Sequence, residues 1–399
     1  MKIVKDKRNW IILISLFSLL FISACTTQPV KPQKQLLPFD TAIQKLAQEL
    51  FSQIESDRPL LFKKANILFD PFIDANSGEV IRVSQSIAKQ IKTEKDINFT
   101  PFELKDIMPE YLATADYIIN GIISLEPYDI SEETKHYHIS ASAFSMDTGK
   151  IVAHSEVWIK EVDLDYTPVS LYQDSPMYLK DAQFKGLVKT ARSQVGEKVD
   201  MRYYELLEVN ALLLQASQAY DNQEYEKAFK LFNQIAEHEA GQVMKTYAGL
   251  YQVARKLNDM QAAEIAFGKM FALGVENDNL SVKFLFSVNK TNFVKNKAVR
   301  NQYKIWLRQI GQFFSTHKHC LQIKGHSSRS GAEQYNDNLS LERAEKIQNL
   351  LKQHFAGITK KSKAMGIGFR ENIIGTGTDD ARDAVDRRVE FAIIDCEQL

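Results

Sequence analysis

The chain has 399 residues, and its 50 lysines and arginines are balanced by 50 aspartates and glutamates. A chain without net charge has no overall field that attracts nucleic acid, so we expect no nucleic-acid partner. The length suits two or three domains. The patterns below predict a multidomain α+β protein, with an N-terminal α/β domain, a central all-α region and a C-terminal domain built on a mixed sheet.

The first residues have the features of an export signal. Residues 1–10 contain four cationic side chains and one aspartate, and the apolar run Ile11–Ala24 follows them. That run is too short to span a membrane comfortably and is typical of a secretory signal. By itself the run fits an ordinary signal peptide or a membrane anchor followed by a chance cysteine.

Residues Ile22–Cys25, "ISAC", resemble a bacterial lipobox. The resemblance implies cleavage before Cys25 and acylation of this residue, with palmitate as a usable label. Several acyl chains make an almost permanent anchor, because each buried methylene contributes ~0.8 kcal/mol. Thr26, where inner-membrane lipoproteins usually carry aspartate, favours the outer membrane with the protein facing the periplasm. We therefore predict a lipoprotein signal peptide at 1–24 and a lipidated cysteine with an extended tether at 25–36.

Residues 37–195 mix helical and strand patterns. Apolar residues recur at helical spacing from Leu37 to Ile54, and "ANILFDPFID" and "TADYIINGIISLEPY" have the composition of strands. "HYHISASAFSM" and "KIVAHSEVWIKE" alternate around the turn "DTGK", which predicts a hairpin. The order is weakly similar to curli-secretion (CsgG-like) and flagellar (FlgO-like) lipoprotein domains. An unrelated α/β envelope domain explains the pattern equally well.

Residues 200–276 have an almost continuous helical pattern that repeats every 35 residues. The repeat superimposes alanines and aromatic residues, namely Ala219 on Ala254, Ala228 on Ala263, Phe232 on Phe267 and Ile235 on Met270. This spacing resembles tetratricopeptide repeats, whose stacked helices often form a groove for a peptide or protein. A plain helical spacer is the alternative. With the first interpretation, other envelope proteins are the expected partners of this region and of the α/β domain.

Residues 280–396 predict the order β-α-β-α-β-β. This region resembles the OmpA-like peptidoglycan-binding domain, and a series of matched positions in the correct order carries the resemblance: Gly325, Gly331, Tyr335-Asn336, Leu339-Ser340, Arg343-Ala344, Gly366, Gly368 and Asp386–Glu390. The family's ligand is a peptidoglycan stem peptide of the diaminopimelate type, whose side chain ends in an ammonium and a carboxylate.

The resemblance implies a binding site at one end of the sheet. Its predicted residues are Ser327, Ser328, Asn336, Leu339, Arg343, Arg387 and Arg388. Arg343 can hold the stem carboxylate through two parallel hydrogen bonds, because its guanidinium is a planar fork. Ser328 stands where the family has an aspartate that accepts the ammonium, so binding should be about tenfold weaker. A different stem preference, or loss of wall binding in favour of a docking role, would also fit this serine.

The remaining reactive residues form no recognisable site. His317, His319, Cys320 and His326 lie close in sequence, but no matching ligand pair accompanies them, so we expect no metal and no cofactor. No catalytic motif is evident, and an enzyme would need scattered side chains such as Asp70, Asp74 and Glu79. We interpret these three as ordinary loop carboxylates and expect no enzymatic activity.

A disulfide between Cys320 and Cys396 is expected in an exported chain. Once Cys25 is acylated, these are the remaining thiols, and the periplasm is oxidising. If the strands that carry them pair antiparallel, the register that places Ser328 opposite Arg388 also places Cys320 opposite Cys396. Two separate thiols are the alternative.

Together these features predict an outer-membrane lipoprotein that binds peptidoglycan non-covalently and scaffolds an envelope assembly. The alternative is a regulator that docks onto a cell-wall-synthesis enzyme and activates it, with wall binding weakened or lost.

Replacing Cys25 with alanine tests the predicted anchor. The variant should lack acyl chains, so it should neither label with palmitate nor fractionate with outer membranes. The neighbouring substitution Thr27→Ala should leave both properties intact. Normal labelling of Cys25→Ala would contradict the anchor.

Overall fold

The computed structural model describes residues 35–58, 64–129, 134–295, 297–373, 375 and 386–399. From Leu36 to Leu399 the chain forms one compact unit. The predicted signal peptide, Cys25 and nearly all of the tether lie outside the described residues. None of the described helices combines the length and apolar character that crossing a bilayer requires.

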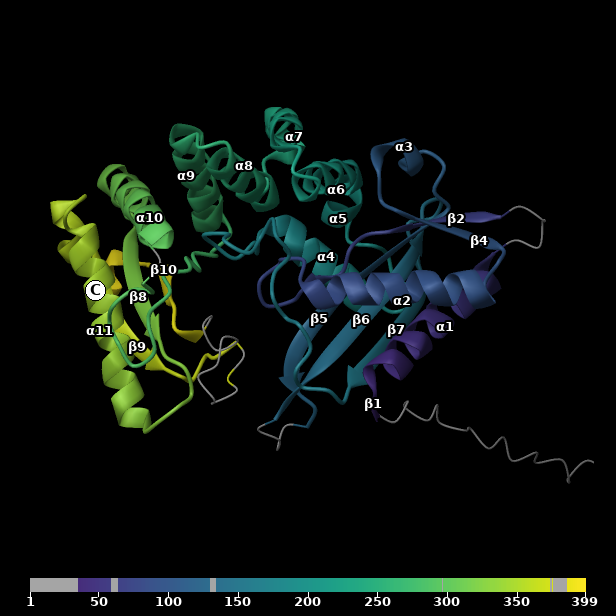
Figure 1. Ribbon diagram of the computed structural model, residues 1–399, viewed down its shortest axis with the longest axis horizontal. Helices are drawn as coiled ribbons and strands as arrows, with labels where there is room; N and C mark the ends of the chain where they lie inside the picture. The colour runs from purple at the N-terminus through teal and green to yellow at the C-terminus, as the bar shows by residue number, and fades with distance from the viewer. Residues whose placement is uncertain (1–34, 59–63, 130–133, 296, 374, 376–385) are drawn as a thin grey trace, which may run out of the picture. The chain divides into compact units, whose positions relative to one another are not determined.

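A seven-stranded sheet forms the centre of the N-terminal part, as far as the chain is described (Figure 1). Its strands are β1 (Leu36–Leu37), β2 (Ala65–Phe69), β3 (Ile73–Asp74), β4 (Phe102–Asp106), β5 (Tyr117–Pro127), β6 (Lys135–Ser145) and β7 (Ile151–Ile159). Their order is β1-β7-β6-β5-β2-β4, with β3 beside β5. β2 runs parallel to β4 and β5, and β5, β6 and β7 run antiparallel in turn. The predicted hairpin is present, and Gly149 makes its turn with a φ of 64°.

Helices cover both faces of this sheet. α1 (Phe39–Asp57) and α2 (Arg82–Asn98) pack on one face, and α4 (Ala182–Arg192), α5 (Met201–Glu205) and α6 (Leu207–Asp221) pack on the other. The short helix α3 (Pro109–Leu112) follows β4. Alternate residues of β2 supply the two cores, since Ile67 joins the α1 and α2 side and Leu68 joins the opposite side. The core of the α/β part therefore continues into α5 and α6, which the sequence assigned to the helical region.

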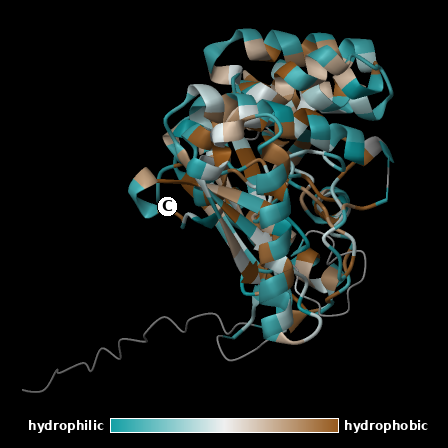
Figure 2. Ribbon diagram, turned by 90° about the vertical axis from the view of Figure 1, so that its left-hand side faces the viewer, coloured by the Kyte–Doolittle hydropathy of each residue, from teal (hydrophilic) through white to brown (hydrophobic). Residues whose placement is uncertain are grey.

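The predicted central helical region is present. It contains α6, α7 (Tyr225–Glu237), α8 (Met244–Lys256) and α9 (Met260–Glu276). The turns after α6 and α8 are alike: Gln223 and Asn258, 35 positions apart, have φ values of 63° and 60°. Every position of the predicted repeat is buried. The buried residues of α7, namely Ala228, Phe232 and Ile235, recur at helical spacing, and Figure 2 shows hydrophobic and hydrophilic residues interspersed along the helices of the chain. The resemblance to tetratricopeptide repeats stays a prediction.

The C-terminal part contains α10 (Lys297–Thr316), β8 (Cys320–His326), α11 (Glu333–Leu351), β9 (Ser362–Gly368) and β10 (Val389–Ile394). The sheet is mixed, because β8 lies between an antiparallel β10 and a parallel β9. The first predicted strand is not a regular strand. Between Leu280 and Phe286 the chain makes only isolated bridges, as far as it is described. Val282 and Phe284 each donate their backbone N–H to the carbonyl two residues earlier, and these tight turns use the groups that a ladder needs.

A disulfide joins Cys320 to Cys396, with a Cα–Cα distance of 5.1 Å. β8 and β10 are antiparallel as expected, but the predicted register is wrong by two residues. Gly325 faces Val389 and Cys320 faces Ile394. The chain leaves β10 after Ile394 and turns at Asp395, whose carboxylate accepts from the N–H of Glu397. This turn, rather than the strand register, brings Cys396 to Cys320.

Replacing Cys396 with serine should destabilise the C-terminal part. The bridge spans a sequence separation of 76 residues. By chain entropy such a loop contributes roughly 4 kcal/mol. Denaturant unfolding, followed by hydrogen exchange in β8 and β10, should show the loss. Reductant should destabilise the unsubstituted chain and leave Cys396→Ser unchanged. Equal stability of the unsubstituted chain with and without reductant would contradict a bridge in the folded protein.

Candidate functional site

The predicted binding residues gather where β8 ends and α11 begins. Two glycines let the helix lie directly on the sheet. A Cβ on Gly325 would be 1.8 Å from the Ser340 carbonyl oxygen, and one on Gly366 would be 2.3 Å from the Asp337 carbonyl oxygen. The hydroxyl of Ser340 accepts from the N–H of Gly368 at 2.9 Å. Because of this contact, the first turns of α11 are fixed beside the ends of β8 and β9.

All seven predicted residues are buried, each at most 7% exposed: Ser327, Ser328, Asn336, Leu339, Arg343, Arg387 and Arg388. The backbone N–H of Ser327 donates to the carbonyl of Gly368 at 2.9 Å, which holds the loop after β8 against the end of β9. Asn336 braces the other end of that loop, since its amide donates to the carbonyls of Ser330 and Ala332 at 2.8 and 3.1 Å.

Arg343 is fully buried and is bound by backbone carbonyls. Its Nη1 donates to the carbonyl of His326 at 2.9 Å. Its Nε and Nη2 both donate to the carbonyl of Lys290 at 3.1 Å, and Nη2 also donates to that of Ser287 at 3.1 Å. The ring of Phe286 lies under the guanidinium, with 5.2 Å from Cζ to the ring centroid. α11, the end of β8 and the 287–290 loop therefore meet at this one side chain.

The arginines that precede β10 bind neighbouring backbone in the same way. Arg387 Nε donates to the carbonyl of Phe286 at 3.4 Å. Arg388 Nη2 donates to the carbonyl of Glu371 at 3.1 Å, and its Nε donates to the Glu390 carboxylate at 2.7 Å. Asp386, also buried, accepts from the backbone N–H groups of residues 373 and 375 at 2.6 and 2.7 Å. Both arginines therefore lie beside the end of β8, near the other predicted residues, and we call the seven predicted residues together the rim.

A cavity of about 410 Å³ lies between the 289–292 loop and α11. Its lining residues are Asn289, Lys290, Thr291, Asn292, Tyr335, Asn338, Leu339 and Glu342. Leu339 was predicted. The sequence reasoning missed Lys290 and Tyr335, although Tyr335 is 48% exposed and stands in the quoted Tyr-Asn pair. Arg343 does not line this cavity, but Lys290, whose carbonyl binds the guanidinium, does.

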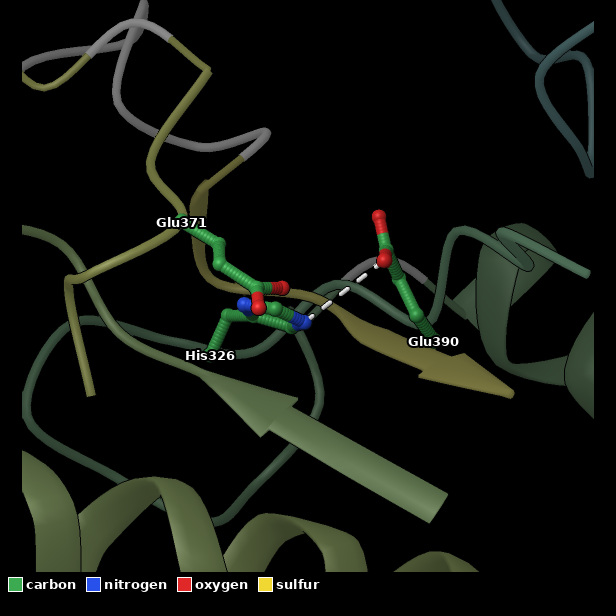
Figure 3. Close-up of side chains that lie close together, drawn as sticks. All are labelled: His326, Glu371 and Glu390. Atoms are coloured by element: carbon green, nitrogen blue, oxygen red, sulfur yellow. Dashed lines mark ion pairs between the residues drawn. The ribbon is translucent and has the colours of Figure 1, made fainter. Parts of the chain in front are cut away.

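The histidines that lie close in sequence do not form one group. His317 and His319 are exposed and stack on the ring of Phe313, and Cys320 is in the disulfide. His326 instead lies beside Glu371 and Glu390, and the possible ligand atoms of these three residues are all within 4.8 Å of one another (Figure 3). Sequence reasoning missed this group, because its members come from three separate segments.

Burial and the charge of Arg388 lower the pKa of His326 to about 3, against the opposing charge of Glu390. Burial alone would raise the pKa of Glu390, but the charges of Arg388 and His326 and the hydrogen bond from Arg388 lower it to about 2. At neutral pH the imidazole is therefore neutral and the carboxylate is charged.

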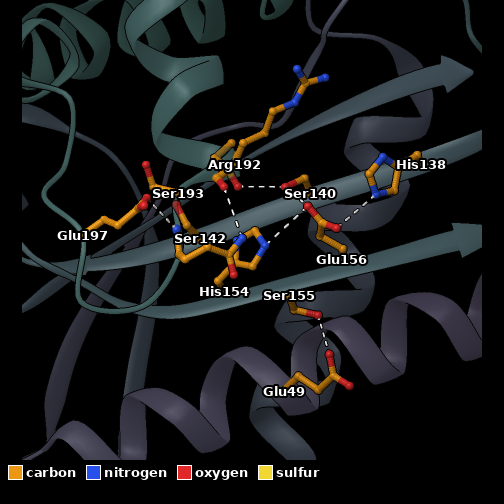
Figure 4. Close-up of polar contacts among 12 residues, drawn as sticks. Glu49, His138, Ser140, Ser142, His154, Ser155, Glu156, Arg192, Ser193 and Glu197 are labelled. Atoms are coloured by element: carbon orange, nitrogen blue, oxygen red, sulfur yellow. Dashed lines mark hydrogen bonds and ion pairs between the residues drawn. The ribbon is translucent and has the colours of Figure 1, made fainter. Parts of the chain in front are cut away.

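A second polar cluster lies on β6 and β7 (Figure 4). His138 contacts Glu126 at 2.6 Å and Glu156 at 3.7 Å, and His154 contacts Glu156 at 3.4 Å. Hydrogen bonds from the two histidines lower the pKa of Glu156 strongly. The neighbouring Ser140 donates to the carbonyl of Ala191 at the end of α4. The bond from Ser140 helps to hold α4 on the sheet beside this cluster.

The interpretation of Asp70, Asp74 and Glu79 as ordinary loop carboxylates is wrong. All three are buried, at 7%, 2% and 1% exposure, because later segments of the chain cover their loops. Asp70 accepts from Tyr203 of α5 at 2.6 Å, and Glu79 pairs with Lys283. Burial raises the pKa of Glu79 to about 7, against the charge of Lys283.

Residues 286–386 match the OmpA family, so the chain carries an OmpA-family domain there. The outer membrane protein Omp38, from two strains of Acinetobacter baumannii, is 27% identical over 120 residues. This match covers 30% of the chain and 32% of Omp38, so the chain spans about a third of the length of these curated relatives.

The solved structures that are similar to part of this chain include the following three. The peptidoglycan-associated lipoprotein from Burkholderia pseudomallei is 23% identical, and the match covers 28% of this chain and 89% of that protein, with a TM-score of 0.25. An outer membrane protein from Borrelia burgdorferi is 23% identical, and the match covers 29% of this chain and 87% of that protein, with a TM-score of 0.23. The C-terminal domain of Helicobacter pylori MotB is 14% identical, and the match covers 28% of this chain and 84% of that domain, with a TM-score of 0.23.

Replacing Gly325 with alanine should displace α11 from the sheet, because the added methyl would collide with the Ser340 carbonyl. Overpacking of this kind costs about 1–3 kcal/mol. The matched control is Gly268→Ala in α9, where the nearest atom is the mobile amide end of Gln309. The control should be neutral or slightly stabilising. Equal denaturation midpoints for the two variants would show that the close approach at Gly325 does not constrain the site.

Proposed function

We propose that this chain is an outer-membrane lipoprotein facing the periplasm, and that its C-terminal domain binds peptidoglycan non-covalently through a stem peptide of the diaminopimelate type. OmpA-like domains are typical of peptidoglycan-binding envelope proteins, and the match at residues 286–386 supports the proposal. The lipobox-like "ISAC" supports the anchor. The α/β part and the helical region would then engage other envelope proteins and scaffold an assembly.

The contact between Arg343 and Lys290 carries the binding proposal. A carboxylate is gripped by two parallel donors of a guanidinium. In Arg343, Nε and Nη2 form such a pair, and both donate to the single carbonyl of Lys290. That carbonyl therefore occupies the position of a ligand oxygen. A stem carboxylate that enters from the cavity beside Leu339 would replace it, and the 287–290 loop would move aside.

The ammonium of the stem would lie toward Ser328 in the loop after β8. A hydroxyl accepts a hydrogen bond but brings no charge. Hydrogen bonds to charged partners contribute about 1.5–3 kcal/mol and neutral ones about 0.5–1.5 kcal/mol. An aspartate at this position should therefore improve binding by about tenfold.

The second candidate is a regulator that docks onto a cell-wall-synthesis enzyme. The same two residues favour it, since Ser328 lacks the charge and Arg343 already has carbonyl partners. Wall binding would then be weak or absent, and the rim would contact protein instead.

Ser328→Asp should increase co-sedimentation with purified peptidoglycan about tenfold, because it supplies the missing negative charge. Ser328→Asn, of similar size but neutral, is the matched control and should bind like the unsubstituted chain. Because misfolded protein also pellets, each variant is centrifuged without peptidoglycan as well, and only the peptidoglycan-dependent fraction counts as binding.

Arg343→Lys should reduce co-sedimentation, because lysine keeps the charge but loses the two parallel donors. Circular dichroism should confirm that the variant folds. If neither the unsubstituted chain nor Ser328→Asp sediments with peptidoglycan, the wall-binding proposal is wrong and the docking role is favoured.

A further inference from the structure

Three side chains converge beside the rim from separate segments (Figure 3). His326 is the last residue of β8, Glu371 lies in the loop after β9, and Glu390 is the second residue of β10. His326 Nε2 is 3.7 Å from a carboxylate oxygen of Glu390. Two ligands at that separation can share one cation, since metal distances to imidazole nitrogen and carboxylate oxygen are about 2.0–2.2 Å.

The surroundings of the His326 side chain also indicate that a ligand binds there. Its side chain is fully buried, yet neither ring nitrogen has a hydrogen-bond partner among the described residues. Buried polar atoms nearly always have partners. The ring is aimed between the two carboxylates, at a distance too long for a hydrogen bond to Glu390.

Arg388 positions the carboxylate of Glu390 and the backbone of Glu371. Its Nε donates to one oxygen of Glu390 at 2.7 Å, which leaves the other oxygen facing His326. Its Nη2 donates to the backbone carbonyl of Glu371 at 3.1 Å. Groups that bind the ligands of a metal in this manner fix the ligand orientation. The Glu371 side chain is exposed, so it can rotate to close the remaining distance.

We propose that His326, Glu371 and Glu390 bind a divalent transition-metal ion, with Zn²⁺ as the first choice. One imidazole and two carboxylates suit zinc, and water would complete a four-coordinate site. The two carboxylates balance the charge of the ion. The charge of Arg388 is partly balanced by Asp386, at 3.9 Å.

Nearby lysines limit the affinity of this site. The positive charges of Lys180 and Lys324 act on Glu390 and His326 respectively. They oppose a cation, so a strong chelator should remove the metal. We therefore expect the bound ion to exchange with free metal in solution.

A bound ion would order the rim. It would tie the loop at Glu371 to the ends of β8 and β10, next to Ser327. Arg370 already connects the same loop to α11 through Glu333 at 3.0 Å and Asp337 at 2.8 Å. The proposed metal would also connect this loop to the sheet, through His326 and Glu390. The metal proposal does not depend on peptidoglycan binding.

The test uses the full chain, stripped with EDTA and titrated with ZnCl₂ by calorimetry, with metal content measured by mass spectrometry after desalting. The unsubstituted chain should bind one ion at this site. Glu371→Gln should weaken binding by at least about tenfold, because it removes one ligand. The matched control Glu345→Gln changes an exposed glutamate of α11 outside the cluster and should bind zinc normally.

Two further variants make the outcome decisive. His326→Phe keeps a ring in the buried position and should also lose zinc. His317 and His319 are exposed neighbours that could bind zinc themselves, so the double variant His317→Gln/His319→Gln should retain the site. Zinc binding that survives Glu371→Gln, or disappears with the His317/His319 substitutions, would overturn the proposal, as would the absence of zinc binding by the unsubstituted chain.

Discussion

A buried guanidinium must find its hydrogen bonds inside the protein, and much of the C-terminal part is arranged around this requirement at Arg343. Desolvating a cation is costly unless donors and acceptors are matched. The carbonyls of Ser287, Lys290 and His326 provide acceptors from two separate segments. One side chain of α11 therefore positions the loop before α10 and the end of β8. The same loop covers the guanidinium, so in the proposed binding mode a stem carboxylate would have to replace the contact that positions this loop.

The segment Leu280–Phe286 is not a regular strand, because its contacts hold it on the α/β part. Lys283 pairs with Glu79 of the α/β part, and its backbone N–H donates to the carbonyl of Pro176. The carbonyl of Ser281 accepts from the N–H of Tyr178 in the same region. Backbone groups that would extend the sheet are therefore used to hold the segment on the α/β part, and only single bridges to β10 remain.

Local patterns predicted the elements of the fold well, because each depends on residues close in sequence. The hairpin around Gly149 and the central helices follow from spacing that the chain itself displays. The register of β10 could not be obtained in this way. The prediction assumed that β10 continues to Cys396, whereas the strand ends at Ile394. The turn that follows is stabilised by a hydrogen bond from the N–H of Glu397 to the Asp395 carboxylate, which the alternation of apolar residues does not encode. The burial of Asp70 was missed for a similar reason, since Tyr203 and its helix come from far along the chain.

A sequence motif singled out the residues that are proposed to bind, but it could not show the hydrogen-bond partners that the fold gives them. A motif predicted Arg343, and only the fold shows that it binds the carbonyl of His326. The backbone of His326 thus serves the arginine, whereas its side chain faces Glu390. In the proposed binding mode the 287–290 loop moves aside, so the carbonyl of His326 keeps its bond to Arg343 and the imidazole keeps its position beside Glu390. The proposed carboxylate site and the proposed metal site therefore share His326 without depending on one another.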